Sequence, residues 1–111
     1  MMNYIIHIAQ TAERDISHAA DYIEFVLKNP QAADHLLGEI QRQVSSLSQF
    51  PAKHPLIDDK ILSSWGVRFI KVGNYLAFYT ISEEEKRVTV VRFLYAKSNW
   101  HSILKLGFPL I

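Results

Sequence analysis

The sequence contains no cysteine, which excludes disulfide bonds, thiolate zinc sites and cysteine nucleophiles. Glycine and proline are also scarce, with 4 of each in 111 residues, so collagen-like repeats and low-complexity linkers are excluded. The longest apolar runs fall far short of the roughly 20 residues that a membrane-spanning helix needs. With 49% hydrophobic and 21% charged residues, we expect one folded domain that spans residues 1–111.

Signals for several kinds of site are missing as well. The glycines are too scattered for a phosphate-binding loop, and the 5 histidines show no metal-ligand spacing. Asp15 and His18 are one helical turn apart, but a surface ion pair explains that spacing as well as a metal does. We therefore expect no metal and no cofactor. The first residues lack the basic and apolar regions of a secretory signal, which favours a cytoplasmic location.

Acidic residues are absent from Lys86 to the end of the chain, a segment that carries five basic residues. The net charge of +1 hides this imbalance. Residues 1–50 hold three basic and six acidic residues, whereas residues 51–111 hold nine and five. A basic segment can contact a polyanion or an acidic partner, and it can equally be a solvated face of the fold. The charge pattern leaves both interpretations open.

Apolar periodicity predicts a short first strand followed by two helices. Residues 4–9 are rich in isoleucine and predict the strand. Apolar residues then recur at helical spacing over 11–28, where Thr11 can cap the first turn, and again over 30–49. The Asn29-Pro30 pair between them suits a cap followed by a first helical position. So short a link predicts an antiparallel helix hairpin.

The second half of the chain predicts a loop, three strands and a tail. Residues 50–65 have little periodicity, so we expect a loop that holds a turn of helix or a short extended piece near residues 57–62. Gly73-Asn74 is typical of a tight turn between two strands. The strands are expected within residues 66–95, at 66–72, 75–81 and 87–95.

These elements predict an α+β fold in which the first strand joins a three-stranded antiparallel meander and the helix hairpin covers one face of the sheet. Residues 87–95 are partly apolar on both faces and carry Arg92, so we expect the opposite face to be open, apolar and basic at its rim. The tail, residues 96–111, is expected to hold a short helix. Trp100 should pack this helix against the rest of the fold, and Gly107 and Pro109 should end it.

Several segments, taken in order, resemble a known family. Residues 11–16 (TAERDI), 29–33 (NPQAA) and 47–51 (LSQFP) carry part of the resemblance. The strongest parts are residues 66–79 (GVRFIKVGNYLAFY) and 90–95 (VVRFLY). Each segment is degenerate alone, but the ordered set resembles the RelE/ParE superfamily of toxins from bacterial type II toxin–antitoxin systems, and its ParE branch more closely.

The resemblance implies a compact cytoplasmic toxin that inhibits growth, takes part in plasmid stabilisation, uses no cofactor and is held inactive by an antitoxin encoded beside it. RelE-like members cleave mRNA in the ribosomal A site, whereas ParE-like members poison DNA gyrase without being nucleases. In either case we expect a toxin–antitoxin hetero-oligomer with no membrane contact. An antitoxin helix or strand would cover apolar surface and meet Lys97 or Arg68 with acidic residues.

The two branches imply different site residues. A metal-free ribonuclease needs a base, cations for the phosphate and an acid. In RelE-like enzymes an arginine lies in the strand that matches residues 74–79, and Leu76 stands at its position. If the chain is nevertheless a nuclease, the candidate catalytic residues are Arg68, Arg92, Tyr95, Lys97 and His101. ParE-like members often have His at the position of Tyr95 and Arg at that of Lys97, so the chain departs from both branches there.

The candidates for contact with a target or an antitoxin overlap with these. They are Arg68, Lys71, Arg92, Tyr95, Lys97 and Trp100. Arg68 can bind phosphate or an acidic target, or it can pair with Asp58 or Asp59 and pin the preceding loop. Arg92 can contact a partner or extend across the sheet. Trp100 can stack on a base or seal the edge of the core.

Leu76 and the match over residues 66–79 favour a non-catalytic toxin that binds an essential target, DNA gyrase by analogy with ParE. The alternative is a ribosome-dependent mRNA endoribonuclease. A third hypothesis is a member without toxicity that only binds its antitoxin.

Overall fold

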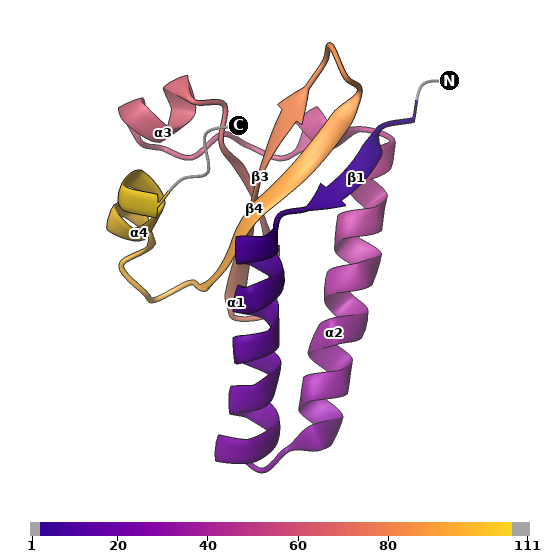
Figure 1. Cartoon of the computed structure of the whole chain (residues 1–111), viewed down its shortest axis with the longest axis vertical. Helices are drawn as coiled ribbons and strands as arrows, with labels where there is room; N and C mark the ends of the chain where they lie inside the picture. Colours follow the sequence, from indigo (N-terminus) through magenta and orange to yellow (C-terminus); the bar gives the residue numbers. More distant parts are fainter. Residues whose placement is uncertain (1–2, 108–111) are drawn as a thin grey trace.

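The computed structural model describes residues 3–107 and contains one four-stranded sheet in the order β1-β4-β3-β2 (Figure 1). The first strand, β1 (Ile5–Ile8), runs parallel to β4 (Arg87–Tyr95). β4, β3 (Tyr75–Ser82) and β2 (Arg68–Val72) form the antiparallel meander. The predicted α+β fold, with the first strand in the same sheet as the meander, is confirmed.

The helix hairpin is built from three consecutive elements. α1 (Gln10–Asp21) continues into a π-helical turn, η1 (Tyr22–Val26), and α2 (Pro30–Ser45) returns antiparallel to both. The Asn29 side chain accepts a hydrogen bond from the backbone N–H of Ala32, at 3.1 Å, so the predicted cap is confirmed. α2 ends in a short 3-10 turn, η2 (Ser46–Ser48).

Thr11 does not cap α1, contrary to the prediction. The helix begins one residue earlier, and the residue at its N-cap is Ala9, which supplies no side-chain hydrogen bond. The Thr11 hydroxyl instead donates to the carbonyl of Val91 in β4, at 2.8 Å. This hydrogen bond joins residues 80 positions apart and replaces the local cap. Apolar periodicity carries no information about such a contact.

The segment between η2 and β2 holds two short helical elements. They are η3 (Pro51–Lys53) and α3 (Lys60–Ser64), and Leu56 pairs with Arg68 as an isolated bridge. The expected local structure near residues 57–62 is therefore present as the start of α3. The tail forms α4 (Trp100–Gly107). Pro109, expected to help end that helix, lies outside the described residues.

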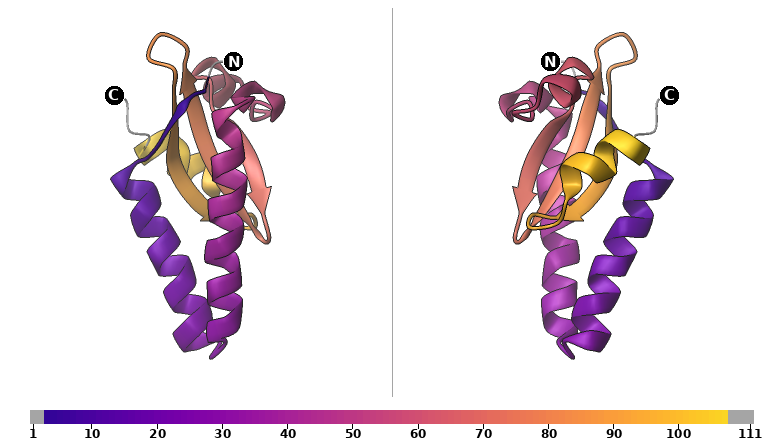
Figure 2. Two further views of the ribbon diagram at one scale, coloured as in Figure 1. Left: turned by 90° about the vertical axis from the view of Figure 1, so that its right-hand side faces the viewer. Right: turned by 90° about the vertical axis from the view of Figure 1, so that its left-hand side faces the viewer.

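Two hydrophobic cores lie on opposite faces of the sheet. The hairpin covers one face, and residues from α1, α2, η2 and the sheet form the larger core there. On the other face Ile57, Leu62 of α3 and Leu104 of α4 pack with Leu76 and Phe78. The two side views show α4 on the face opposite the hairpin (Figure 2). The expectation of an open second face is therefore wrong, because a loop with no helical periodicity still buries isolated apolar side chains there.

α1 also completes the edge of β4. Beyond the end of β1, the backbone N–H of Ala9 donates to the carbonyl of Val90 at 2.9 Å. The Thr11 hydroxyl then bonds the carbonyl of Val91, and the Asp15 carboxylate accepts from the backbone N–H of Phe93 at 3.0 Å. Side chains of α1 thus satisfy polar groups that β1 is too short to reach.

Candidate functional site

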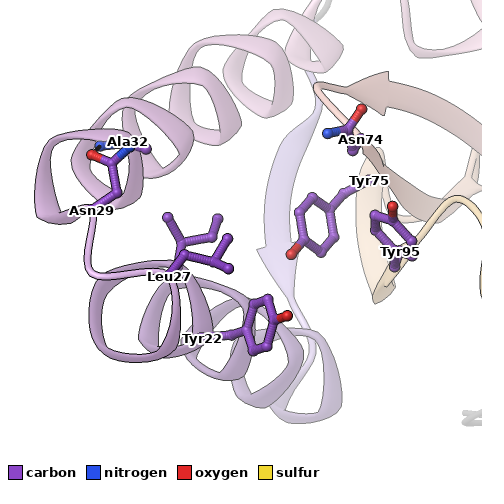
Figure 3. A pocket seen from close by; sticks show the side chains of 8 residues that line it. Tyr22, Leu27, Asn29, Ala32, Asn74, Tyr75 and Tyr95 are labelled. Carbon is purple, nitrogen blue, oxygen red and sulfur yellow. Dashed lines mark hydrogen bonds between the residues drawn. The ribbon is translucent and has the colours of Figure 1, made fainter.

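A groove of about 640 Å³ lies where the helix hairpin extends past the end of the sheet. One wall is the end of the hairpin and the other is the β2–β3 turn with the end of β4 (Figure 3). Its lining is uncharged and consists of Tyr22, Ile23, Leu27, Asn29, Ala32, Asn74, Tyr75 and Tyr95. A groove of this size and composition suits a peptide segment with an apolar face.

The helical wall of the groove is apolar and exposed, and it begins with the π-helical turn η1. The backbone N–H of Leu27 donates to the carbonyl of Tyr22, five residues earlier, at 3.0 Å. Lys28 then takes a left-handed conformation with φ of 54° and reverses the chain. Exposed fractions are 51% for Tyr22, 66% for Phe25 and 55% for Leu27. Of these three residues, Tyr22 and Leu27 line the groove.

The floor of the groove is aromatic. The ring of Tyr75 stacks on Phe93 with centroids 5.0 Å apart and meets Tyr95 edge to face at 5.6 Å. Burial and the neighbouring hydroxyls of Tyr95 and Tyr22 raise the pKa of Tyr75. The phenol therefore stays protonated at neutral pH and can donate a hydrogen bond.

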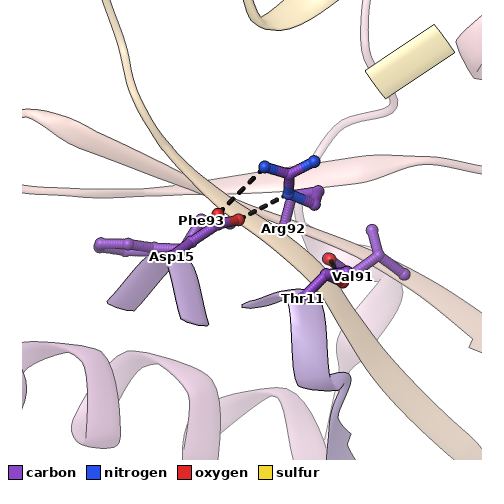
Figure 4. Close-up of polar contacts among 5 residues, drawn as sticks. All are labelled: Thr11, Asp15, Val91, Arg92 and Phe93. Atoms are coloured by element: carbon purple, nitrogen blue, oxygen red, sulfur yellow. Dashed lines mark hydrogen bonds and ion pairs between the residues drawn. The ribbon is translucent and has the colours of Figure 1, made fainter. Parts of the chain in front are cut away.

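Arg92 is held by an ion pair with Asp15 (Figure 4). Its Nε and Nη2 donate to the two carboxylate oxygens at 2.6 and 3.0 Å. Both side chains are largely shielded from solvent, with exposed fractions of 19% for Arg92 and 13% for Asp15. The guanidinium therefore does neither of the two things considered for it, contact with a partner or extension across the sheet, and Asp15 pairs with Arg92 rather than with His18. This pair attaches α1 to β4.

Arg68 pins the preceding loop through carbonyl groups. Its Nη1 donates to the carbonyl of His54 at 2.6 Å and to that of Ala52 at 3.2 Å. The expected pairing with Asp58 or Asp59 is wrong. Asp59 instead caps α3, accepting from the backbone N–H groups of Ile61 and Leu62, and binds Lys105 of α4 at 2.8 Å. Those contacts lower the pKa of Asp59 and leave its carboxylate committed to helix packing.

Replacing Arg68 with alanine is expected to lower the free energy of unfolding by about 1–2 kcal/mol, because two loop carbonyls lose a charged donor. The Tyr79 hydroxyl, which donates to the carbonyl of Pro51 at 2.6 Å, keeps the start of the loop in place. Urea denaturation followed by circular dichroism measures the change. Lys71→Ala, at an exposed position of the same strand, is the control and should leave stability nearly unchanged. Equal stability of the Arg68 and Lys71 variants would contradict the role given to Arg68.

The comparisons with known proteins agree with this architecture. Residues 6–100 match the family model described as the ParE toxin of type II toxin–antitoxin system, parDE. The chain belongs to the ParE toxin family. The matched segment runs from β1 to the first residue of α4 and includes every residue that lines the groove. A search of curated proteins finds no significant match to this ParE-family chain.

Two solved structures share the fold of this ParE-family chain. The chromosomal ParDE toxin–antitoxin system from P. aeruginosa is similar with a TM-score of 0.69 and 19% identity, over 85% of this chain and 97% of the other. The toxin–antitoxin complex RelBE2 from Mycobacterium tuberculosis is similar with a TM-score of 0.60 and 19% identity, over 87% and 97% of the two chains. At these identities the likeness establishes the fold.

The nuclease candidates do not gather at one place in this ParE-family chain. In the strand register Arg68 lies opposite Tyr79 of β3, whereas Tyr95 lies opposite Tyr75. Tyr75 and Tyr79 are four residues apart along β3. That spacing separates the two positions by roughly 14 Å along the sheet. His101 stacks on Trp100 in α4, with centroids 3.6 Å apart, on the face opposite the hairpin.

The predicted contact residues are also divided between the two faces. Trp100 packs on Phe78, with centroids 5.3 Å apart, in the core beneath α4. Lys71 is exposed on the edge strand β2, and Lys97 is exposed in the turn after β4. Of all the predicted site residues, only Tyr95 lines the groove. The signal that could have pointed to the groove is the group of five apolar residues at 22–27, interrupted by Glu24, because they are too many for one helical face.

The basic excess of the C-terminal segment is mostly balanced within the fold. Lys86 pairs with Glu83 at 3.2 Å, and Arg87 lies 3.8 Å from Glu85. Arg92 and Lys105 pair with Asp15 and Asp59, as described above. Among residues 3–107, Lys97 is the one basic residue of this segment with no carboxylate partner. A general polyanion-binding face is therefore less well supported than one local basic contact at Lys97.

The described residues form neither a metal centre nor a membrane-spanning helix. Within residues 3–107 no group of three or more histidine, aspartate or glutamate side chains is placed to hold a metal ion. In the described part of the chain, no helix combines the length and the apolar character that crossing a membrane requires.

Proposed function

We propose that this chain is the growth-inhibiting toxin of a type II pair and that it acts by binding an essential protein, DNA gyrase by analogy with its family, rather than by cleaving RNA. The observation that carries the proposal is the engagement of both candidate arginines in structural contacts. Arg92 is paired with Asp15, and Arg68 is bonded to loop carbonyls. Leu76, which stands where RelE-like enzymes have an arginine, is buried beneath α3 and α4.

The groove supports an antitoxin as the partner that neutralises the toxin. Both solved relatives are described as a toxin–antitoxin system or complex. The helical wall of the groove leaves Tyr22 and Leu27 more than half exposed, an arrangement typical of a surface that a partner segment covers. We place the complex in the cytoplasm, where gyrase and ribosomes act.

The supercoiling activity of gyrase tests the choice of target. The purified chain, freed from its antitoxin, is expected to abolish supercoiling at a small molar excess, and added antitoxin is expected to restore it. Primer extension on ribosome-bound mRNA, run in parallel, is expected to show no new ends. Lack of inhibition by a large excess of folded protein would contradict the gyrase assignment.

The parallel assay also separates the alternatives. Cuts placed at codon positions would favour the endoribonuclease and would direct attention to Tyr95, Lys97 and His101. Normal growth of a bacterium that expresses the folded chain without antitoxin would favour the non-toxic binding module. Each of these outcomes overturns the proposed activity and leaves the antitoxin partner as a separate question.

A further inference from the structure

Three tyrosine side chains from three different elements line the same groove. Tyr22 belongs to η1, Tyr75 begins β3 and Tyr95 ends β4 (Figure 3). Residues 3–107 offer no hydrogen-bond partner to any of the three hydroxyls. In a groove whose other lining residues are apolar or carry an amide, these phenols are therefore polar groups that a bound segment must either satisfy or leave unpaired.

The surroundings of the hydroxyls favour an acceptor as the missing partner. A phenol is a better donor than acceptor, and the side-chain amide of Asn74 adds further donor capacity. The groove lining contains no carboxylate; Asp21 and Glu24 lie on the same helical segment as Tyr22 but do not line it. A negatively charged acceptor would meet donors here and no like charge.

Lys97 adds a positive charge close to this end of the groove. It lies in the turn that begins at Tyr95, where the backbone N–H of Ala96 donates to the carbonyl of Asn74 at 2.9 Å. The hydroxyl and the backbone N–H of Ser98 both donate to the carbonyl of Tyr95 and hold the turn in shape. Because Lys97 has no carboxylate partner among the described residues, it is available to a carboxylate from outside.

We propose that this groove selects an antitoxin segment whose apolar face carries one carboxylate, held by the tyrosine hydroxyls and Lys97. The inference rests on the proposed function, since it assumes that an antitoxin fills the groove. Apolar contacts provide most of the affinity, and the carboxylate provides the specificity for one antitoxin over others. A segment without an acceptor would leave buried donors unpaired, a difference that discriminates more strongly than the size of an apolar side chain.

Removal of single hydroxyls tests the proposal with little risk to folding, because phenylalanine keeps the ring. The probe is the antitoxin encoded by the neighbouring reading frame, purified and titrated by calorimetry. Tyr75→Phe and Tyr95→Phe are each expected to weaken binding about tenfold. Tyr4→Phe is the matched control, because the Tyr4 hydroxyl bonds Glu83 outside the groove and its loss should leave affinity unchanged.

A double-mutant cycle identifies the carboxylate. Each aspartate or glutamate of the antitoxin's toxin-binding segment is changed to its amide and combined with Tyr75→Phe or Lys97→Ala. One carboxylate should couple to both positions, so that the combined losses are smaller than the sum. Wild-type affinity of the phenylalanine variants, or strict additivity for every carboxylate, overturns the inference. Failure of the unchanged chain to bind the antitoxin would instead contradict the proposed partner.

Discussion

Replacing Asp15 with alanine is expected to lower the free energy of unfolding by about 3 kcal/mol. The change removes an acceptor of three hydrogen bonds, two from Arg92 and one from the backbone N–H of Phe93. The guanidinium would then be left largely shielded from solvent without its counter-charge, and the edge of β4 would lose its link to α1. Urea denaturation followed by circular dichroism gives the change in free energy.

Two further variants separate the ion pair from a general effect of charge. Asp21→Ala removes an exposed carboxylate at the end of α1 that makes no ion pair within the described residues, and it should change stability by less than about 0.5 kcal/mol. Asp15→Asn keeps an oxygen that can accept from the N–H of Phe93 and should be less damaging than alanine. An Asp15→Ala protein as stable as the Asp21 variant would show that the pair does not hold α1 to the sheet.

Replacing Leu27 with glutamate is expected to weaken antitoxin binding more than a hundredfold. Leu27 is 55% exposed in the free chain, so the fold should tolerate the change, but in the complex the new carboxylate would lose its water and would lie in the same groove as the carboxylate that we propose the antitoxin brings. A hundredfold loss corresponds to about 2.7 kcal/mol, well within the cost of burying an unpaired charge. Calorimetric titration with the antitoxin measures the affinity.

Val26→Glu is the matched control for Leu27→Glu. Val26 is adjacent in sequence and 62% exposed, but it does not line the groove. Its replacement should leave the affinity within a few fold of wild type. In cells that express the antitoxin, the Leu27 variant should escape neutralisation and stop growth, whereas the Val26 variant should remain neutralised. Equal loss of binding by the two variants would place the antitoxin elsewhere on the hairpin.

Local signals predicted the order of elements well. Apolar periodicity located the two helices, Asn29 and Pro30 located the turn between them, and Gly73-Asn74 located the tight turn between β2 and β3. Each of these features depends on residues within a few positions of one another. The parallel pairing of β1 with β4 could not be predicted from local signals, because a strand of four residues carries no information about which strand lies beside it.

The site was predicted less well than the fold. Arg68 and Arg92 were identified as working residues, but their partners lie 14 to 77 positions away and are brought to them only by the folded chain. The groove was missed apart from Tyr95, because its walls come from the end of a hairpin and the end of a sheet. No stretch of sequence contains both walls.

Local patterns were enough to predict the class of fold, the helix hairpin, the meander and the resemblance to the ParE toxins, since periodicity, turn residues and ordered motifs are local. The tertiary structure decided which charged side chains are free and which surface is open. It covered the face expected to be open with α3 and α4 and exposed the groove instead. The physical reason is that ion pairing and burial depend on contacts between distant residues, which the linear order does not specify.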